Sequence, residues 1–415
     1  MYLANGKPRS SCDFRNVFKP FCSLPKELLH EITTYLPVND IVSFCLVCKE
    51  FNQLGLNILY KAIQNVNTRC FDTLACNSRN ARAVKTLALP SQVNSQLDIG
   101  CTWLGPQENV HDPPFERPSE DVKAASILPY LSGLQNLSVP SFSAIYTQSL
   151  SQCDFSNLQI FSYSMPITQP IASFISRNNS IVSLTFDCYL PFFQNFVLRP
   201  ITLPQLRYLS GNPQIIKIFA QHAPLETVHI DWKYERARIE VFDDALGFLA
   251  LHCCTTVKEL SVHRNTFRQC TCNNQILVKI SEKFPRITKL GLNSIDISNG
   301  SIVMVNTAMS RFEYLKYLNM DQHPPSAVCP PRLFGSTQLD YDRDEALILS
   351  WTSDNCCSEL RECQLPNGIL WCLRGPKLWL PSLSTIPQRK SLLLDASKWR
   401  ECRARAAGLD IRDLL

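Results

Sequence analysis

Residues 23–37 read SLPKELLHEITTYLP and decide how the first part of this chain folds. Ser23 suits the N-cap of a helix, Pro25 suits its first turn, and Pro37 ends it. The apolar residues recur at helical spacing and form one stripe, which consists of Leu24, Leu28, Leu29, Ile32 and Leu36. The stretch therefore predicts a short amphipathic helix with one face to bury.

Two more helices are predicted directly after this one. The first begins at Asn39 or Asp40 and is apolar nearly all round as far as Phe51. The second covers about residues 53–63. Three short helices cannot bury this much apolar surface among themselves, so we expect a partner protein to cover part of it.

The order and spacing of these residues resemble the F-box motif over Leu24–Ile63. The matching segments are LPxELLxEIxxYLP, DIxxFxLVCKxF and LYxxI. The resemblance implies a three-helix F-box, which we assign to residues 23–65, bound to a Skp-type linker protein. By matching position, the linker-binding residues would be Leu24, Pro25, Leu28, Ile32, Leu36, Ile41, Val47 and Phe51. The alternative is a helical cap for the rest of the chain with no linker.

After these helices, an apolar frame of the form LxxLxL recurs ten times, with other apolar residues allowed. The frames begin at Val84, Leu134, Leu158, Ile181, Leu206, Leu225, Val257, Ile287, Leu315 and Leu360. Most starts are 19 to 32 residues apart, close to the roughly 20–29 residues of a leucine-rich repeat. Two gaps, of 50 and 45 residues, hold either a skipped repeat or an insert.

Helix-like segments such as Asn273–Phe284 separate the frames. This alternation stacks parallel strands on the inside and helices on the outside. The chain thus resembles F-box proteins with C-terminal leucine-rich repeats, of the irregular kind common in fungi. The expected fold class is α/β, with the F-box followed by a leucine-rich-repeat solenoid over residues 66–415. A mixed α/β globule with accidental matches is the alternative.

Several segments fall outside this repeat pattern. Residues 1–22 are expected to form a flexible leader. Proline-rich inserts near residues 91–121 and 322–342 are predicted to be disordered or to contact a target. A C-terminal capping helix is predicted over residues 395–407, with Asp395 as its N-cap and Gly408 as its stop.

Composition excludes several classes of protein. A net charge of +5 over 415 residues does not indicate a nucleic-acid or membrane-surface protein. No apolar run approaches the ~20 residues of a membrane span, and the N-terminus lacks a signal core, so we expect a cytoplasmic or nuclear protein. The 19 cysteines are then read as reduced thiols that fill apolar positions, for example Cys45, Cys188, Cys253 and Cys363.

Catalytic motifs are missing from the sequence. No phosphate loop, dinucleotide-binding glycine pattern or nucleophile elbow is present. Residues 252–254, His263, Cys270 and Cys272 are possible zinc ligands by residue type, but their spacing does not fit the usual ligand pairs. We therefore expect no catalytic residues, no metal and no cofactor, and a protein that is not an enzyme.

The resemblance implies a non-catalytic substrate-recognition subunit of an SCF-type ubiquitin ligase. The F-box would bind the Skp-type linker, the linker a cullin–RING scaffold, and the repeats an unknown protein target that is ubiquitinated for degradation. The alternative is an F-box scaffold that acts outside ubiquitin transfer.

A target-binding face is predicted from strand alternation, because residues between the apolar positions point to the open side. In the first half of the array these are small: Ser138, Ser162, Thr185 and Ser210. In the second half they are larger and more polar: His229, Asp231, Glu259, His263, Lys289, Asn293, Tyr317, Asn319 and Asp321. We expect the target on the second half; the alternative is that these positions are merely solvated.

Overall fold

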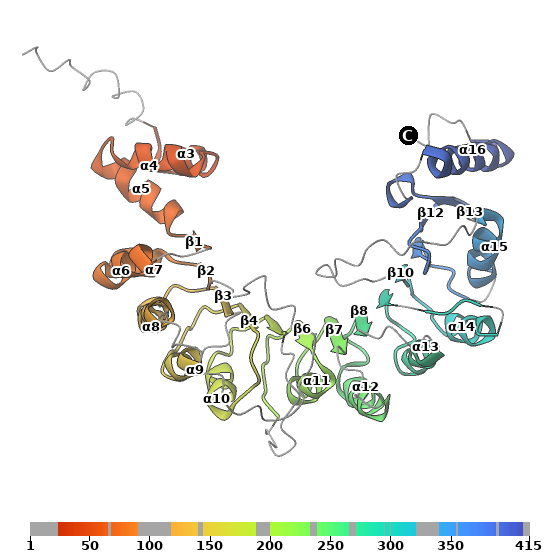
Figure 1. The fold of residues 1–415 in the computed structure, drawn as a ribbon, viewed down its shortest axis with the longest axis horizontal. Coiled ribbons are helices and arrows are strands. Elements are labelled where there is room, and N and C mark those ends of the chain that lie inside the picture. The colour runs from red at the N-terminus through yellow and green to blue at the C-terminus, as the bar shows by residue number, and fades with distance from the viewer. Residues whose placement is uncertain are drawn as a thin grey trace, which may run out of the picture.

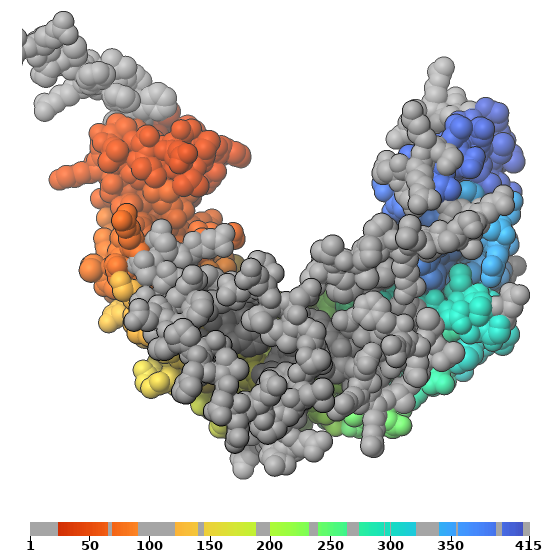
Figure 2. Space-filling model, in the orientation of Figure 1, coloured from red at the N-terminus to blue at the C-terminus, as the bar shows by residue number. Residues whose placement is uncertain are grey.

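The protein is an open arc in this computed structural model, with strands along the inside and helices along the outside (Figure 1). The structure describes residues 24–64, 68–89, 118–139, 144–187, 200–232, 239–264, 271–293, 295–298, 300–320, 340–353, 356–386 and 390–409. The space-filling view shows the N-terminal helices at one end of the arc and the C-terminal elements at the other (Figure 2). The fold is therefore mixed α/β with a helical N-terminus.

Three helices form the N-terminal unit: α3 (Lys26–Thr34), α4 (Val38–Cys45) and α5 (Lys49–Leu59). The boundary between the second and third helices was predicted wrongly, because α4 ends at Cys45 and Phe51 belongs to α5. Cys48 produces this break, since its Sγ accepts a hydrogen bond from the backbone N–H of Phe51 at 3.5 Å and caps α5. The expected N-cap residues Asn39 and Asp40 lie inside α4, which starts after Pro37.

A single sheet of thirteen strands runs the length of the arc, and its strands follow one another in chain order. Neighbouring strands from β1 to β11 are parallel, and β12 and β13 are antiparallel. The strands are β1 (Ala62–Ile63), β2 (Thr86–Ala88), β3 (Asn136–Val139), β4 (Ile160–Tyr163), β5 (Ser183–Phe186), β6 (Tyr208–Gly211), β7 (Thr227–Trp232), β8 (Glu259–Arg264), β9 (Lys289–Leu292), β10 (Tyr317–Asn319), β11 (Glu362–Gln364), β12 (Leu370–Gly375) and β13 (Leu378–Pro381).

The ten apolar frames coincide with strands β2 to β11, one frame to each strand. Their apolar positions are buried and stack in register from strand to strand, as Leu87 does on Leu137 and Leu137 on Phe161. The core lies between this stacked row and the outer helices. Aromatic rings fill its middle, where Phe186 of β5 stacks on Phe219 at 5.6 Å.

Outer helices connect most of the strands. They are α6 (Thr68–Cys76), α7 (Ser78–Ala83), α8 (Pro118–Ile127), α9 (Ala144–Ser151), α10 (Gln169–Arg177), α11 (Pro213–Phe219), α12 (Ile239–Cys253), α13 (Thr271–Lys283), α14 (Ile302–Met309) and α15 (Tyr341–Trp351), with the short 3-10 turn η1 (Leu128–Tyr130) after α8. Among the described helices, none is long and apolar enough to cross a membrane.

Both long gaps between frames are inserts rather than skipped repeats. β2 pairs directly with β3 across the gap of 50 residues, and β10 pairs directly with β11 across the gap of 45. A skipped repeat would have placed a strand between them. Each predicted insert was a few residues too long, since α8 begins at Pro118 and α15 at Tyr341. The rest of both inserts and the leader, residues 1–22, lie outside the described residues.

The C-terminal end closes with a hairpin that the sequence did not predict and with the predicted terminal helix. The hairpin β12–β13 turns at Lys377, whose φ is 57°. After the 3-10 turn η2 (Leu383–Thr385), the last helix α16 spans Lys390–Ala406. It begins before the predicted start, so Asp395 lies within the helix instead of capping it. Gly408 follows the helix with a φ of 75°, the left-handed conformation typical of a helix stop.

The N-terminal helices are followed directly by the first strand of the sheet. Residues 60–63 were predicted to continue the third helix, but α5 stops at Leu59 and Ala62–Ile63 form β1. The carbonyl of Lys61 accepts hydrogen bonds from the N–H groups of Lys85 and Thr86, both at 2.9 Å. The segment 23–65 assigned to the helical unit therefore also contains the first strand of the sheet.

Candidate interaction surfaces

The N-terminal helices expose an unusual amount of apolar surface. Seven of the sixteen exposed large hydrophobic side chains among the described residues lie between residues 28 and 47. They are Leu28, Ile32, Tyr35, Val38, Val42, Leu46 and Val47, with Leu46 83% and Tyr35 79% exposed. A soluble surface seldom concentrates apolar groups in this way unless a partner covers them. We call these seven residues the apolar surface.

The eight predicted linker-binding residues divide between the surface and the interior. Leu28, Ile32, Val47 and Pro25 are exposed, and Leu24 and Leu36 are half-buried. The other two are buried, with Ile41 4% and Phe51 3% exposed.

These two residues form the core of the helical unit instead. Phe51 stacks on Phe44 with ring centroids 4.2 Å apart, and Ile41 faces α5 at Gly55. The prediction in turn missed Tyr35, Val38, Val42 and Leu46, which are all exposed. The sequence indicated these residues only through its excess of apolar positions around α4. A helix at the surface buries one face, so the other apolar positions must be exposed.

Close packing holds the three helices in one arrangement. Thr33 is fully buried on α3, and its hydroxyl donates to the carbonyl of Leu29 at 2.5 Å. The Asn52 amide of α5 donates to the carbonyl of Cys45 at 3.1 Å, which ties α5 to the end of α4. The apolar surface is therefore presented by a rigid unit.

A second candidate surface is the inner face of the sheet, where side chains stand in two rows that cross the strands. The first row is Thr86, Asn136, Ile160, Ser183, Tyr208, Thr227, Glu259, Lys289, Tyr317 and Glu362. The second row is Ala88, Ser138, Ser162, Thr185, Ser210, His229, Ser261, Gly291, Asn319 and Gln364. Alternate residues of each strand therefore face the open side, as expected for strands.

The structure brings most of the predicted target-binding residues together on this face. Glu259, Lys289 and Tyr317 are neighbours in the first row, and Lys289 Nζ lies 3.4 Å from Glu259 Oε2. His229 and Asn319 stand in the second row.

Three more of these residues lie beyond the two rows. Asp231 and His263 are register partners further along β7 and β8. Asn293, which was expected on the open face, is only 8% exposed. Asp321 lies outside the described residues.

The two halves of the inner face differ in charge. From β2 to β7 neither row contains an acidic or basic side chain apart from His229, whose pKa is lowered mainly by burial and further by His263. That ring is therefore neutral near pH 7, and it lies against Tyr208 with centroids 5.3 Å apart. Going from β2 towards β11, the first charged side chain in the two rows is Glu259 on β8. The prediction missed Ile160 and Tyr208 in the first half, and Ile160 is 43% exposed.

The cysteines that the structure describes are free thiols. Cys45, Cys253 and Cys363 are buried, and Cys188 lies outside the described residues. Burial raises the pKa of the Cys253 thiol to about 11, and its Sγ lies 3.3 Å from the carbonyl oxygen of Ala220. Within the described ranges, no three His, Cys, Asp or Glu side chains are arranged to hold a metal ion.

Comparison with known proteins supports the reading of the N-terminal helices. A family model described as F-box-like matches residues 21–64. A search of curated proteins found none with significant similarity to the chain. The chain therefore carries an F-box-like domain, formed by α3, α4, α5 and β1. F-box domains generally bind Skp-type linker proteins.

Proposed function

We propose that this chain is the substrate-recognition subunit of an SCF-type ubiquitin ligase and is not itself an enzyme. The observation that carries the proposal is the apolar surface, which lies within the F-box-like domain at one end of a long sheet. An adaptor needs two separate binding surfaces. The apolar surface and the inner face of the sheet would supply them on one chain.

The array is, in our proposal, a degenerate leucine-rich-repeat solenoid. Each of the ten frames supplies one strand, and the strands pair in chain order, so that each unit packs only on its neighbours. The asparagine that usually follows the strand in such repeats is mostly missing, so the repeats are degenerate.

Such a chain would act by proximity. The F-box would join the Skp-type linker, the linker would join a cullin–RING scaffold, and the scaffold would bring a ubiquitin-loaded conjugating enzyme. Ubiquitin transfer would then occur on these partners. By holding a target nearby, the chain would raise the effective concentration of the target's lysines at the loaded enzyme.

The target would bind the inner face, mainly over β8 to β11. That part of the face combines an exposed tyrosine, Tyr317, with the charged residues Glu259, Lys289 and Glu362 in one row. Specific polar interfaces use such mixtures of aromatic and charged groups.

Reconstitution tests the proposal. The chain should co-purify with the Skp-type linker and, through it, with the cullin. Proximity labelling with the proteasome blocked should then enrich proteins whose ubiquitination depends on the chain. Binding to the linker without the cullin would contradict the ligase role and favour a scaffold outside ubiquitin transfer. No binding to the linker would overturn both.

A further inference from the structure

The amino ends of the strands form one continuous edge along the sheet. In each unit, the residue just before the strand donates its N–H to the carbonyl of the equivalent residue in the preceding unit. Lys85 donates to Lys61 at 2.9 Å, and Arg361 donates to Lys316 at 2.8 Å. We call the eleven residues in this ladder the amino-edge row. Six of them are lysine or arginine and one is glutamate, a net charge of +5 that equals the formal net charge of the whole chain.

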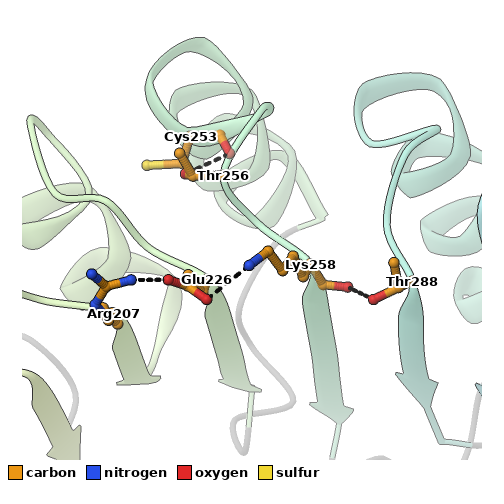
Figure 3. A network of polar contacts seen from close by, with 6 residues as sticks. All are labelled: Arg207, Glu226, Cys253, Thr256, Lys258 and Thr288. Atoms are coloured by element: carbon orange, nitrogen blue, oxygen red, sulfur yellow. Dashed lines mark hydrogen bonds and ion pairs between the residues drawn. The ribbon is translucent and has the colours of Figure 1, made fainter.

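In the middle of the row, two basic side chains share one acidic partner. Glu226, which precedes β7, pairs with Arg207 on one side and with Lys258 on the other, where Lys258 Nζ lies 3.0 Å from Glu226 Oε2 (Figure 3). Hydrogen bonds from Lys258 and Arg207 lower the pKa of the Glu226 carboxyl, so it stays ionised at neutral pH. This part of the edge therefore offers little unpaired charge to a partner.

Beside the F-box-like domain the charges are not neutralised. Lys61 and Lys85 begin the row, and Arg79 and Arg82 lie next to them on α7. Asn80 and Ala81 of that helix are buried, whereas Arg79 and Arg82 are exposed. The carbonyl oxygen of Arg82, near the end of α7, and the Lys85 ammonium both lie against Gly133. A Cβ atom built on that glycine would overlap the Arg82 oxygen and lie 3.1 Å from Lys85 Nζ.

We call Lys61, Arg79, Arg82 and Lys85 the junction patch. Within the part of the chain that the structure describes, none of the four has an ion-pair partner. The acid of the adjacent helix α6, Asp72, pairs with Lys123 at 2.8 Å instead. The patch is thus a basic surface without ion-pair partners among the described residues.

The junction patch is fixed relative to the F-box-like domain. Lys61 follows the end of α5 by two residues. Tyr60 makes a side-chain hydrogen bond with Asn80 of α7, and α5 packs against α7. A protein bound to the helical domain would therefore meet the patch in one orientation.

We propose that the junction patch is a docking surface for an acidic segment of the linker protein that the F-box binds. This inference rests on the proposed function. Apolar contacts on α3 and α4 supply most of the affinity, while like-charged lysines and arginines beside them attract an acidic face and orient it during the encounter. A basic cluster without ion-pair partners and an exposed apolar surface, held on the same domain through α5, fit a single partner that contacts both.

The experiment measures association of the purified linker with the full chain over a range of salt concentrations. The test variant is Lys61→Glu with Lys85→Glu. The matched control is Lys316→Glu with Arg361→Glu, which alters two adjacent strands of the same row by the same charge at the far end of the array. We expect the test variant to slow association by about tenfold or more at low salt and to flatten its salt dependence, because charges at the rim of an interface act mainly on association. The control should stay within about twofold of the unsubstituted chain.

Equal behaviour of the two variants would overturn the inference, whether both associate normally or both are slowed alike. Circular dichroism establishes that each variant is folded. Should the test variant misfold, Arg79→Gln with Arg82→Gln on the exposed face of α7 provides the same comparison. If the unsubstituted chain does not bind the linker, the F-box proposal itself fails, so the two failures are distinguishable.

Discussion

Gly55 of α5 lies directly against Cys45 of α4, so close that a Cβ atom at residue 55 would overlap the sulfur of Cys45. The same Cβ would lie 3.4 Å from Ile41 Cγ2. Only glycine permits this approach of the two helices. Because α4 carries Val38 and Val42 of the apolar surface, the contact between Gly55 and Cys45 sets how that surface is presented.

Gly55→Ala should therefore destabilise the F-box-like domain. Overpacking a tight contact costs about 1–3 kcal/mol, and α4 would have to move away from α5. We expect a lower thermal midpoint for the complex with the linker and a weaker affinity. The control is Gly300→Ala, because a Cβ there meets nothing within 4 Å. If both substitutions leave stability and affinity unchanged, the packing argument is wrong.

The double substitution Leu28→Ala with Ile32→Ala should abolish linker binding and leave the array folded. Both side chains are exposed, at 47% and 43%, so removing them costs little stability in the free chain. In a packed interface each loss costs about 2–5 kcal/mol. Pull-down with the purified linker measures the effect.

An exposed apolar residue elsewhere provides the control for that experiment. Leu251 of α12 is 77% exposed on the outer side of the array, and Leu251→Ala should not change linker capture. Undiminished capture by the Leu28/Ile32 variant would show that this stripe is not the interface.

Expressed alone, the chain should aggregate, and co-expression with the linker should keep it soluble. The apolar surface is uncovered in the free chain, and a partner that binds only the folded state also stabilises it by mass action. Size-exclusion chromatography of both preparations measures this. A monodisperse free chain would argue that α3 to α5 form only a cap for the array.

Target capture should depend on the second half of the inner face. Tyr317→Ala with Lys289→Ala alters two register neighbours of the first row, whereas Ser138→Ala with Ser162→Ala alters two register neighbours of the second row near the F-box-like domain. We expect the first pair alone to lose captured target, by about tenfold or more, with linker binding kept in both. Equal capture by both variants would place target recognition outside this part of the face.

Stability near the C-terminus should fall between acidic and neutral pH because of Asp344. Burial raises the pKa of this carboxyl to about 6, partly offset by a hydrogen bond of 2.8 Å from the Asn367 amide. In the unfolded chain its pKa is about 3.9. The folded state therefore binds more protons between about pH 4 and pH 6, and stability falls as the pH rises through that window, by roughly 2–3 kcal/mol in all.

Asp344→Asn removes this titration with little change of shape. We expect a higher thermal midpoint than the unsubstituted chain at pH 7.5 and about the same midpoint near pH 4, both measured on the complex with the linker. Asp154→Asn makes the same change of charge on an exposed loop and serves as control. A stabilisation that is equal at both pH values would rule out the Asp344 titration as its source.

Local patterns in the sequence were sufficient to predict most strands and the helical N-terminus. Each of the frames starting at Val84 through Leu360 became one strand, because three apolar positions with alternate polar ones have a single way to bury themselves in a stacked array. Pro25 stands at the start of α3, and Pro37, which was predicted to end the first helix, follows α3 and precedes α4.

Tertiary structure decided what local patterns cannot contain. Whether Ile41 and Phe51 face a partner or the interior depends on how α4 crosses α5, which the Gly55–Cys45 contact sets. Asn293 looked exposed from strand alternation, yet it is buried beyond the end of β9, where that alternation no longer holds.

The position of the basic charge also depends partly on the sequence and partly on the tertiary structure. The sequence by itself determined that the chain has five more basic than acidic residues and ten apolar frames. Only the stacking of the units placed Lys61 and Lys85 side by side on one edge and brought Glu226 between Arg207 and Lys258 on the same edge. Residues separated by 19 to 32 positions along the chain become neighbours through backbone hydrogen bonds between units. Charge pairing depends on distance in space, so the unpaired patch beside the F-box-like domain exists only in the folded array.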